Sequence, residues 1–235
     1  MTGKKNKPLR HSQDGGYARG DETRQRIIEA AIEVFGEQGF DAATTRQIAT
    51  RAGVNPPALQ YYFDNKEGVY SACARHLAEA NRPAFQPVLD AIEQLPADAP
   101  TAQCVTLFCD LVDTLLDKVF GNDYTLNKRL FHARIQLGQG PEIAFQIMRE
   151  CMGREIHRAG ADLISRLSGE AIDSELTQLR TVALFGQAIT FHIARRSVLD
   201  QLQWKEVDGK RLTQLKKLIR DNNTVMLNSW HNERP

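Results

Sequence analysis

Residues 23–70 read TRQRIIEAAIEVFGEQGFDAATTRQIATRAGVNPPALQYYFDNKEGVY. In the first part of this stretch apolar residues recur at helical spacing, which predicts a helix over about residues 22–37. Thr44 and Thr45 are favourable N-cap residues for a second, short helix over residues 46–52. The stretch therefore predicts a long helix followed closely by a short one.

A tight turn and a third helix are predicted next. Gly53 stands where a left-handed backbone is favourable only for glycine. Asn55 can cap a helix over residues 56–63, and Pro56 and Pro57 fall in its first turn, where their missing N–H groups are tolerated. Two short helices joined by a tight turn and supported by a preceding helix are the signature of a helix-turn-helix.

An alternative explains the apolar positions equally well, because three short helices can be plain core packing in any helical protein. It does not explain the polar residues around the turn, which combine hydroxyls at a helix start with amides, an arginine, a tyrosine and a lysine. These groups suit phosphate oxygens and base edges of DNA. They are Thr44, Thr45, Arg46, Gln47, Gln60, Tyr61 and Lys66.

Over about 50 residues, without a gap, this stretch resembles the N-terminal domain of the TetR (tetracycline-repressor) family. The matching positions are Ala30-Ala31, Phe35, Gly39-Phe40, Thr45, Ile48-Ala49, Ala52-Gly53-Val54, Leu59, Tyr62-Phe63 and Lys66-Glu67. The resemblance implies an all-α fold, with a three-helix DNA-binding domain followed by a larger helical domain that binds a ligand and dimerises. The expected division is a basic arm over 1–20, a helix-turn-helix domain over 21–66 and the second domain over 67–235.

The resemblance also implies roles for single residues. Thr45, Tyr61 and Lys66 would bind backbone phosphates, and Arg46 and Gln60 would lie nearest to base edges. Asn55 and Pro57 would stand at the front of the recognition helix, and the whole expected DNA-binding set also contains Thr44, Gln47 and Tyr62. Many family members have an aromatic residue in place of Gln60, and two adjacent prolines are unusual, so base preference cannot be transferred from a relative.

The remainder of the chain is predicted to be nearly all helix, without convincing β alternation. The expected helices cover residues 66–81, 84–95, 101–119, 125–137, 141–168, 173–199 and 209–230, separated by Pro and Gly positions such as Pro83. The stretches over 130–148 and 185–204 resemble the CecR-like subgroup of the family.

Charge is distributed unevenly along a nearly neutral chain. The net charge of the whole protein is +1, whereas residues 1–26 carry seven basic and three acidic side chains. Residues 1–20 show no apolar periodicity, so we expect a mobile basic arm that follows DNA. The N-terminus has no apolar core of a signal peptide and no segment is long enough to cross a membrane, so we expect a cytoplasmic protein that does not bind membranes.

The sequence contains no recognisable catalytic motif, and we expect neither an enzyme nor a cofactor. Cys73, Cys104, Cys109 and Cys151 are scattered through apolar stretches without a CxxC pair, which is typical of free buried thiols rather than of a zinc site.

Two apolar stripes near the C-terminus predict a homodimer interface. One stripe runs through the helix at 173–199 and the other through the helix at 209–230. Their residues are Leu176, Leu179, Ala183, Gly186, Ile189 and Ile193, and Leu212, Leu215, Ile219, Met226 and Trp230. The alternative is an ordinary core face within one subunit, but a helix-turn-helix regulator usually meets two half-sites as a symmetric dimer.

An effector pocket in the second domain would be apolar with a few polar groups. The residues expected to line it are Phe131, His132, Arg134, Phe145, Met148, Phe185, Gln187 and His192, and simple core packing is the alternative for each. Arg134 needs a counter-charge if it is buried, from an anionic ligand, from Glu142 or Glu155, or from solvent.

The function expected from these features is that of a ligand-responsive repressor. A dimer would bind a palindromic double-stranded DNA operator, and an unknown small-molecule effector would change its affinity. The alternatives are an activator, a ligand-independent DNA-binding protein, or a helical enzyme.

Overall fold

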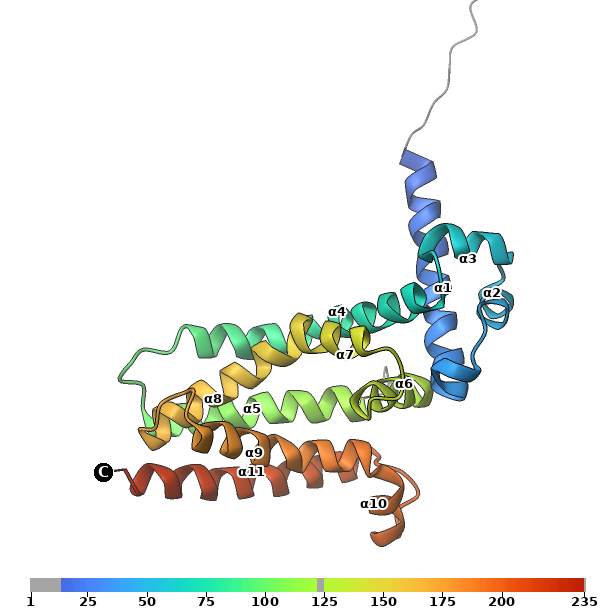
Figure 1. The fold of residues 1–235 in the computed structure, drawn as a ribbon. Coiled ribbons are helices and arrows are strands. Elements are labelled where there is room, and N and C mark those ends of the chain that lie inside the picture. Colours follow the sequence, from blue (N-terminus) through green and yellow to red (C-terminus); the bar gives the residue numbers. More distant parts are fainter. Residues whose placement is uncertain (1–13, 122–124, 235) are drawn as a thin grey trace, which may run out of the picture.

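The computed structural model describes residues 14–121 and 125–234, and all regular elements within these ranges are helices (Figure 1). The N-terminal helices are α1 (Asp14–Ala42), α2 (Thr45–Ala52), α3 (Pro56–Phe63) and the long α4 (Lys66–Glu93). They are followed by α5 (Thr101–Phe120), α6 (Leu126–Gln136), α7 (Glu142–Met148), the single π-turn η1 (Arg149–Gly153) and α8 (Arg154–Ser168). The chain ends with α9 (Glu175–Ile193), α10 (Arg195–Gln201) and α11 (Gly209–Asn232).

The predicted caps and turn of the N-terminal helices are confirmed. Thr44 is the N-cap of α2, Asn55 is the N-cap of α3, and Gly53 adopts a left-handed φ of 65° between them. Each of these features depends on residues within one turn of the chain, which is why the sequence predicted them correctly.

Helix α1 begins earlier than predicted. Residues 14–20 continue the helix, so the expectation of a loose arm over 1–20 is wrong for this part, and residues 1–13 lie outside the described ranges. Apolar periodicity marks only the buried part of a helix, whereas the backbone hydrogen bonds can continue through a polar turn. Near its other end, Gly39 interrupts α1 with a φ of 80°.

The predicted break at Pro83 is also wrong, because α4 runs without interruption through Pro83 and Pro87. A proline inside a helix removes one hydrogen bond and costs about 3 kcal/mol. Burial of an apolar side chain contributes about 1.5–3 kcal/mol, and α4 buries Phe85, Leu89 and Ile92 just after Pro83. Tertiary packing therefore outweighs the local preference of proline.

Two further boundaries differ from the sequence prediction. The single helix expected over 141–168 contains the π-turn η1, and the helix expected over 173–199 is divided at Ala194 into α9 and α10. No proline marks either change, although η1 ends at Gly153.

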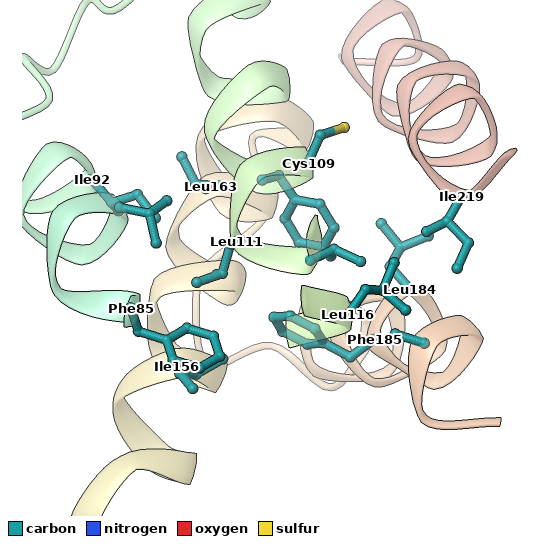
Figure 2. Close-up of a cluster of buried hydrophobic side chains, with 14 of the residues drawn as sticks. Phe85, Ile92, Cys109, Leu111, Leu116, Ile156, Leu163, Leu184, Phe185 and Ile219 are labelled. Atoms are coloured by element: carbon teal, nitrogen blue, oxygen red, sulfur yellow. The ribbon is translucent and has the colours of Figure 1, made fainter. Parts of the chain in front are cut away.

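The buried side chains form two clusters. The larger one joins the second half of α4 with α5, α8, α9 and α11, and Figure 2 shows Phe85, Leu111, Ile156, Leu163 and Phe185 within it. The other lies beneath the helix-turn-helix and contains residues of α1, α2, α3 and the first half of α4. Side chains from α6 and α7 also enter this second cluster, so the expected domain boundary at residues 66–67 runs inside a shared core.

The two C-terminal apolar stripes differ in their exposure. On α9, Leu176, Leu179, Val182 and Ile189 are exposed. On α11, Leu215 and Ile219 are buried within the subunit, and Leu212 and Trp230 pack against that core, so the alternative of an ordinary core face holds for most of this stripe. The exposed apolar side chains of α11 are Leu218, Val225 and Met226. Among the helices described, none is long and apolar enough to cross a bilayer.

Helix α6 packs tightly across α1. A Cβ atom on Gly36 would overlap the carbonyl oxygen of Asn127 and would lie 2.9 Å from its Cα atom. The Asn127 amide donates to the carboxylate of Glu33 and, at 3.3 Å, to that of Glu37, and Nε of Arg134 donates to the Gly36 carbonyl at 3.3 Å. The contact therefore requires glycine at residue 36.

Replacing Gly36 should loosen this contact. In Gly36→Ala the added methyl group meets backbone atoms, which cannot move away as a flexible side chain can, so the free energy of unfolding should fall by about 1–3 kcal/mol. The matched control is Gly209→Ala, where no atom lies within 4 Å of the added Cβ and a change below about 0.5 kcal/mol is expected. Urea unfolding measures the free energy of unfolding of both variants. If Gly36→Ala were as stable as the wild type, the close approach of α6 to α1 would be contradicted.

Candidate nucleic-acid interface

Helices α2 and α3 are held against α1 by their apolar sides. Ile48 and Ala49 of α2 and Leu59 and Phe63 of α3 are all buried in the N-terminal cluster. The guanidinium of Arg24 lies 5.2 Å from the centre of the Phe63 ring, on its face. The opposite sides of both short helices are consequently exposed, and they carry most of the polar residues expected to meet DNA.

Two of these residues, Thr44 and Gln47, form the capping box of α2. The Thr44 hydroxyl accepts from the Gln47 N–H at 3.2 Å, and the Gln47 side-chain oxygen accepts from the Thr44 N–H at 2.8 Å. The Gln47 amide also donates to Gln38 of α1 at 3.1 Å. Both side chains therefore fix the start of α2, where free backbone N–H groups and the helix dipole favour a phosphate.

Thr45 and Arg46 occupy the first turn of α2. Thr45 is partly exposed and Arg46 is exposed, and Arg46 has no ion pair within the ranges 14–121 and 125–234. A cation that is not engaged within the protein is available for a phosphate or a base edge.

The exposed face of α3 carries Gln60 and Tyr61. Tyr61 is 83% exposed, an unusual state for an aromatic residue, and its ring packs edge-on against Tyr62 at 5.1 Å between centroids. Tyr62 is half-buried and packs against the N-terminal cluster. Asn55 caps the helix by accepting from the Ala58 N–H at 3.1 Å, and Pro57 is exposed beside it.

Lys66 occupies a different environment from the one predicted. Its ammonium donates to the carbonyls of Phe40, Asp41 and Ala43 at 2.9, 3.3 and 3.1 Å. It also lies 4.4 Å from the centre of the Phe40 ring. An ammonium has three donors, and all three are used here on the end of α1, which leaves none for a phosphate in this conformation.

Sequence reasoning missed the ion pair that fastens α2 to α1. Both guanidinium nitrogens of Arg51 donate to the carboxylate of Glu37, at 2.7 and 3.0 Å. The hydrogen bond from Arg51 lowers the pKa of Glu37. The two residues are 14 positions apart, so no helical spacing relates them.

The residues expected to line an effector pocket do not meet in one cavity. Phe131, Phe145 and Met148 belong to or pack on the cluster beneath the helix-turn-helix, whereas Phe185 lies in the other cluster. Gln187 donates to Asn223 of α11 at 2.7 Å. His132 and His192 lie next to each other, with 5.1 Å between their ring centroids.

Among the residues that the structure describes, Arg134 has no acidic partner. It donates to the Gly36 carbonyl and, at 3.4 Å, to the side-chain oxygen of Gln139. Glu155, which sequence reasoning considered as its partner, pairs instead with Arg82 at 3.0 Å. Arg134 thus connects α6 to α1, and residues far apart in the sequence determine its role.

A groove of about 430 Å³ lies elsewhere, between α4, α5 and α6. Leu77, Ala80 and Ala84 supply apolar groups, and burial lowers the pKa of His76 at its edge. The remaining lining residues are Asn81, Thr114, Asp117, Lys118, Gly121 and Lys128. This volume is within the range of pockets that hold small molecules.

The described part of the chain contains no group of three His, Cys, Asp or Glu residues that could hold a metal ion. Its four cysteines are free thiols, of which Cys73, Cys104 and Cys109 are buried and Cys151 is partly exposed.

Comparisons with known proteins match both halves of the chain. Residues 27–73 match the family of bacterial regulatory proteins called the tetR family. Residues 106–229 match the C-terminal domain of the HTH-type transcriptional dual regulator CecR. The CecR regulator of Shigella flexneri is 31% identical over 199 residues, covering 82% of this chain and 86% of its own length.

One further relative matches the N-terminal part of the chain, and one solved structure matches its fold. The HTH-type transcriptional regulator SrpR of Pseudomonas putida is 51% identical over 55 residues, 23% of this chain and 26% of its own. The fatty acid degradation regulator FadR of Bacillus halodurans shares the fold, with a TM-score of 0.59 at 18% identity over 85% of this chain and 97% of its own.

Tyr61 and Lys66 should respond differently to substitution. Tyr61→Phe removes one exposed hydroxyl, so DNA affinity should fall about equally for all sequences while the free energy of unfolding changes by less than about 0.5 kcal/mol. Lys66→Met removes charged hydrogen bonds and should lower the free energy of unfolding by about 1.5–3 kcal/mol.

Titrations of DNA at several salt concentrations, with urea unfolding in parallel, separate the two roles. If Lys66→Met were as stable as the wild type and reduced the salt slope by about one, Lys66 would be a phosphate contact after all.

Proposed function

Because the chain belongs to the TetR family of bacterial regulatory proteins, with a C-terminal region of the CecR type, we propose that it is an effector-controlled repressor that binds a palindromic operator as a dimer. In this proposal residues 21–66 read DNA, and residues 67–235 bind the effector and the second subunit. The observation that carries the proposal is the exposed polar face of α2 and α3, mounted on a buried apolar scaffold.

The DNA contacts follow from this face. An α-helix fits the major groove, which is about 12 Å wide, and α3 would enter it with Gln60 and Tyr61 exposed. Thr45 at the start of α2 and Tyr61 on α3 would bind phosphates on either side of the groove. Arg46 pairs well with guanine and Gln60 with adenine, so these two side chains would read bases.

A dimer would cover the exposed apolar faces of α9 and α11. Leu176, Leu179, Val182 and Ile189 lie on α9, and a Cβ added to Gly186 on the same helix would meet nothing within 4 Å. Gln187 of α9 bonds to Asn222 and Asn223 of α11, which keeps the two helices side by side. An apolar surface that also contains a glycine allows a partner helix to approach closely.

The effector would bind in the groove between α4, α5 and α6. Helix α4 continues from this groove into the cluster beneath the helix-turn-helix, and α6 packs across α1 at Gly36. A ligand that separates α4 from α6 would therefore reorient α1 together with α2 and α3. Coupling of about 1–3 kcal/mol is enough to change DNA affinity severalfold.

Selection of bound sequences from random double-stranded DNA with the purified protein tests the function. We expect an inverted repeat whose half-sites are about 34–36 Å apart, one turn of DNA. Arg46→Ala and Gln60→Ala should each relax the preference at one or two base pairs and weaken the best site by about 1–3 kcal/mol. Recovery of no common sequence would overturn the proposed function, and unchanged base profiles in both variants would show that other residues read the bases.

A charge placed on the proposed dimer face should separate the subunits. Val182 is 60% exposed, and Val182→Arg would oppose two guanidinium groups and bury them between apolar helices. Sedimentation should then give a mass near the 26.4 kDa of one chain, and operator affinity should fall with it. Leu137→Arg, at 58% exposure beyond the end of α6, is the matched control and should remain a dimer. A dimeric Val182→Arg protein would move the interface elsewhere.

A further inference from the structure

His76 of α4 belongs both to the groove and to the contact between α4 and α1. It is one of the residues that line the groove between α4, α5 and α6. Its Nε2 atom also lies 3.4 Å from the side-chain nitrogen of Gln25 on α1. One turn further along α1 and one turn back along α4, the Cys73 thiol donates to the Ile28 carbonyl at 3.6 Å. A change in the state of His76 therefore acts on the groove and on α1 together.

The orientation of the Gln25 amide is fixed by Glu29, one turn further along α1. The nitrogen of the Gln25 amide donates to the Glu29 carboxylate at 2.9 Å. A carboxylate only accepts hydrogen bonds, so it faces the NH₂ group of the amide rather than the amide oxygen. The same NH₂ group has a second N–H, and this is the one that meets Nε2 of His76. Gln25 is therefore the donor in its contact with His76.

This donor determines the state of the imidazole that the contact requires. Nε2 of His76 can accept a hydrogen bond only while it carries no hydrogen, so the ring is neutral and its hydrogen is on Nδ1. Protonation of His76 places an N–H on Nε2, directly opposite the N–H of Gln25. Two donors that face each other form no hydrogen bond. The contact between α1 and α4 at this point is therefore lost when His76 gains a proton.

The surroundings of His76 favour the neutral ring. Burial lowers the pKa of His76, Lys128 and Arg24 act in the same direction, and Glu29 and Glu79 oppose them. In the unfolded chain the pKa of the imidazole returns to about 6.5, so the unfolded chain binds the proton more tightly than the folded protein does. The folded state therefore has its full stability above this pH, and it loses stability as the pH falls from there towards the lowered pKa of His76.

We propose that His76 is a proton-controlled coupling residue, which connects the groove to the DNA-binding helices through its hydrogen bond with Gln25. While the ring is neutral, the bond helps to hold α1, and with it α2 and α3, in a fixed position on α4. When the ring is protonated, α1 is held less tightly, and the recognition helices of a dimer lose the fixed spacing that two half-sites require. DNA affinity should therefore fall at acidic pH. The link to the groove rests on the proposed function, whereas the proton-controlled bond does not.

Titrations of the full chain with its selected operator DNA test the coupling, with the proton as the probe. Between about pH 7.5 and about pH 5, the affinity of the wild type should fall about two- to tenfold further than that of His76→Gln. The side-chain oxygen of the new glutamine can accept from Gln25 at either pH. The matched control is His157→Gln, because His157 also meets a glutamine of another helix, Gln178 at 2.6 Å. This control should retain the pH dependence of the wild type.

A substitution at Gln25 should reverse the effect of the proton. In Gln25→Glu the new carboxylate only accepts, so it forms a charge-assisted hydrogen bond with the protonated ring of His76 and none with a bare Nε2. Acidic pH should then strengthen the contact, and the extra fall in operator affinity should disappear or become an increase. A histidine that only fills space between α1 and α4 would not show this reversal.

Thermal unfolding without DNA measures the bond by itself. Over the same pH range the Tm of the wild type should fall by about 2–4 °C more than that of His76→Gln, and Gln25→Glu should show no such excess. Equal pH dependence of the Tm in all three proteins overturns the proposal, as does equal pH dependence of operator affinity in the wild type and His76→Gln. Failure of the proposed function would appear as the absence of a selected operator and would leave the Tm results unchanged.

Discussion

At Gly36 the backbone of α1 comes so close to Asn127 of α6 that no side chain fits between them. The same contact brings the Asn127 amide to Glu33 and the Arg134 guanidinium to the Gly36 carbonyl. Through it Phe131 of α6 enters the cluster beneath the helix-turn-helix and stacks on Phe35. The orientation of the DNA-binding helices therefore depends on a helix of the C-terminal region, because buried interfaces of this density shift as units rather than bending gradually.

The polar side chains of the candidate interface fall into two groups, those that stabilise the fold and those that remain exposed. Thr44, Gln47 and Asn55 cap helices, and Lys66 closes the end of α1 with three hydrogen bonds. Arg46, Gln60 and Tyr61 are exposed, and within the described residues their side chains cap no helix. The capped helices hold the second group rigidly, and a rigid donor array loses less entropy when it binds a fixed groove.

The C-terminal half of the chain exposes apolar side chains on two neighbouring helices. The faces of α9 and α11 expose Val182, Val225 and neighbouring apolar residues, which favours a second subunit.

The sequence by itself determined the helix-turn-helix, its caps and the left-handed turn at Gly53, because these depend on neighbours within one or two helical turns. It also indicated the exposed side of α9 and the family resemblance. Only the tertiary structure decided that α4 continues through Pro83, since burial of Phe85 and Leu89 outweighs a local preference. The partners of Lys66 are 23 to 26 residues away, and the Gly36 carbonyl to which Arg134 donates is 98 residues away, so no local pattern contains these contacts. The same reason explains why the residues expected to line one pocket lie in two different clusters. Amphipathic periodicity shows which side chains of a helix are buried, but not in which of the two clusters they lie.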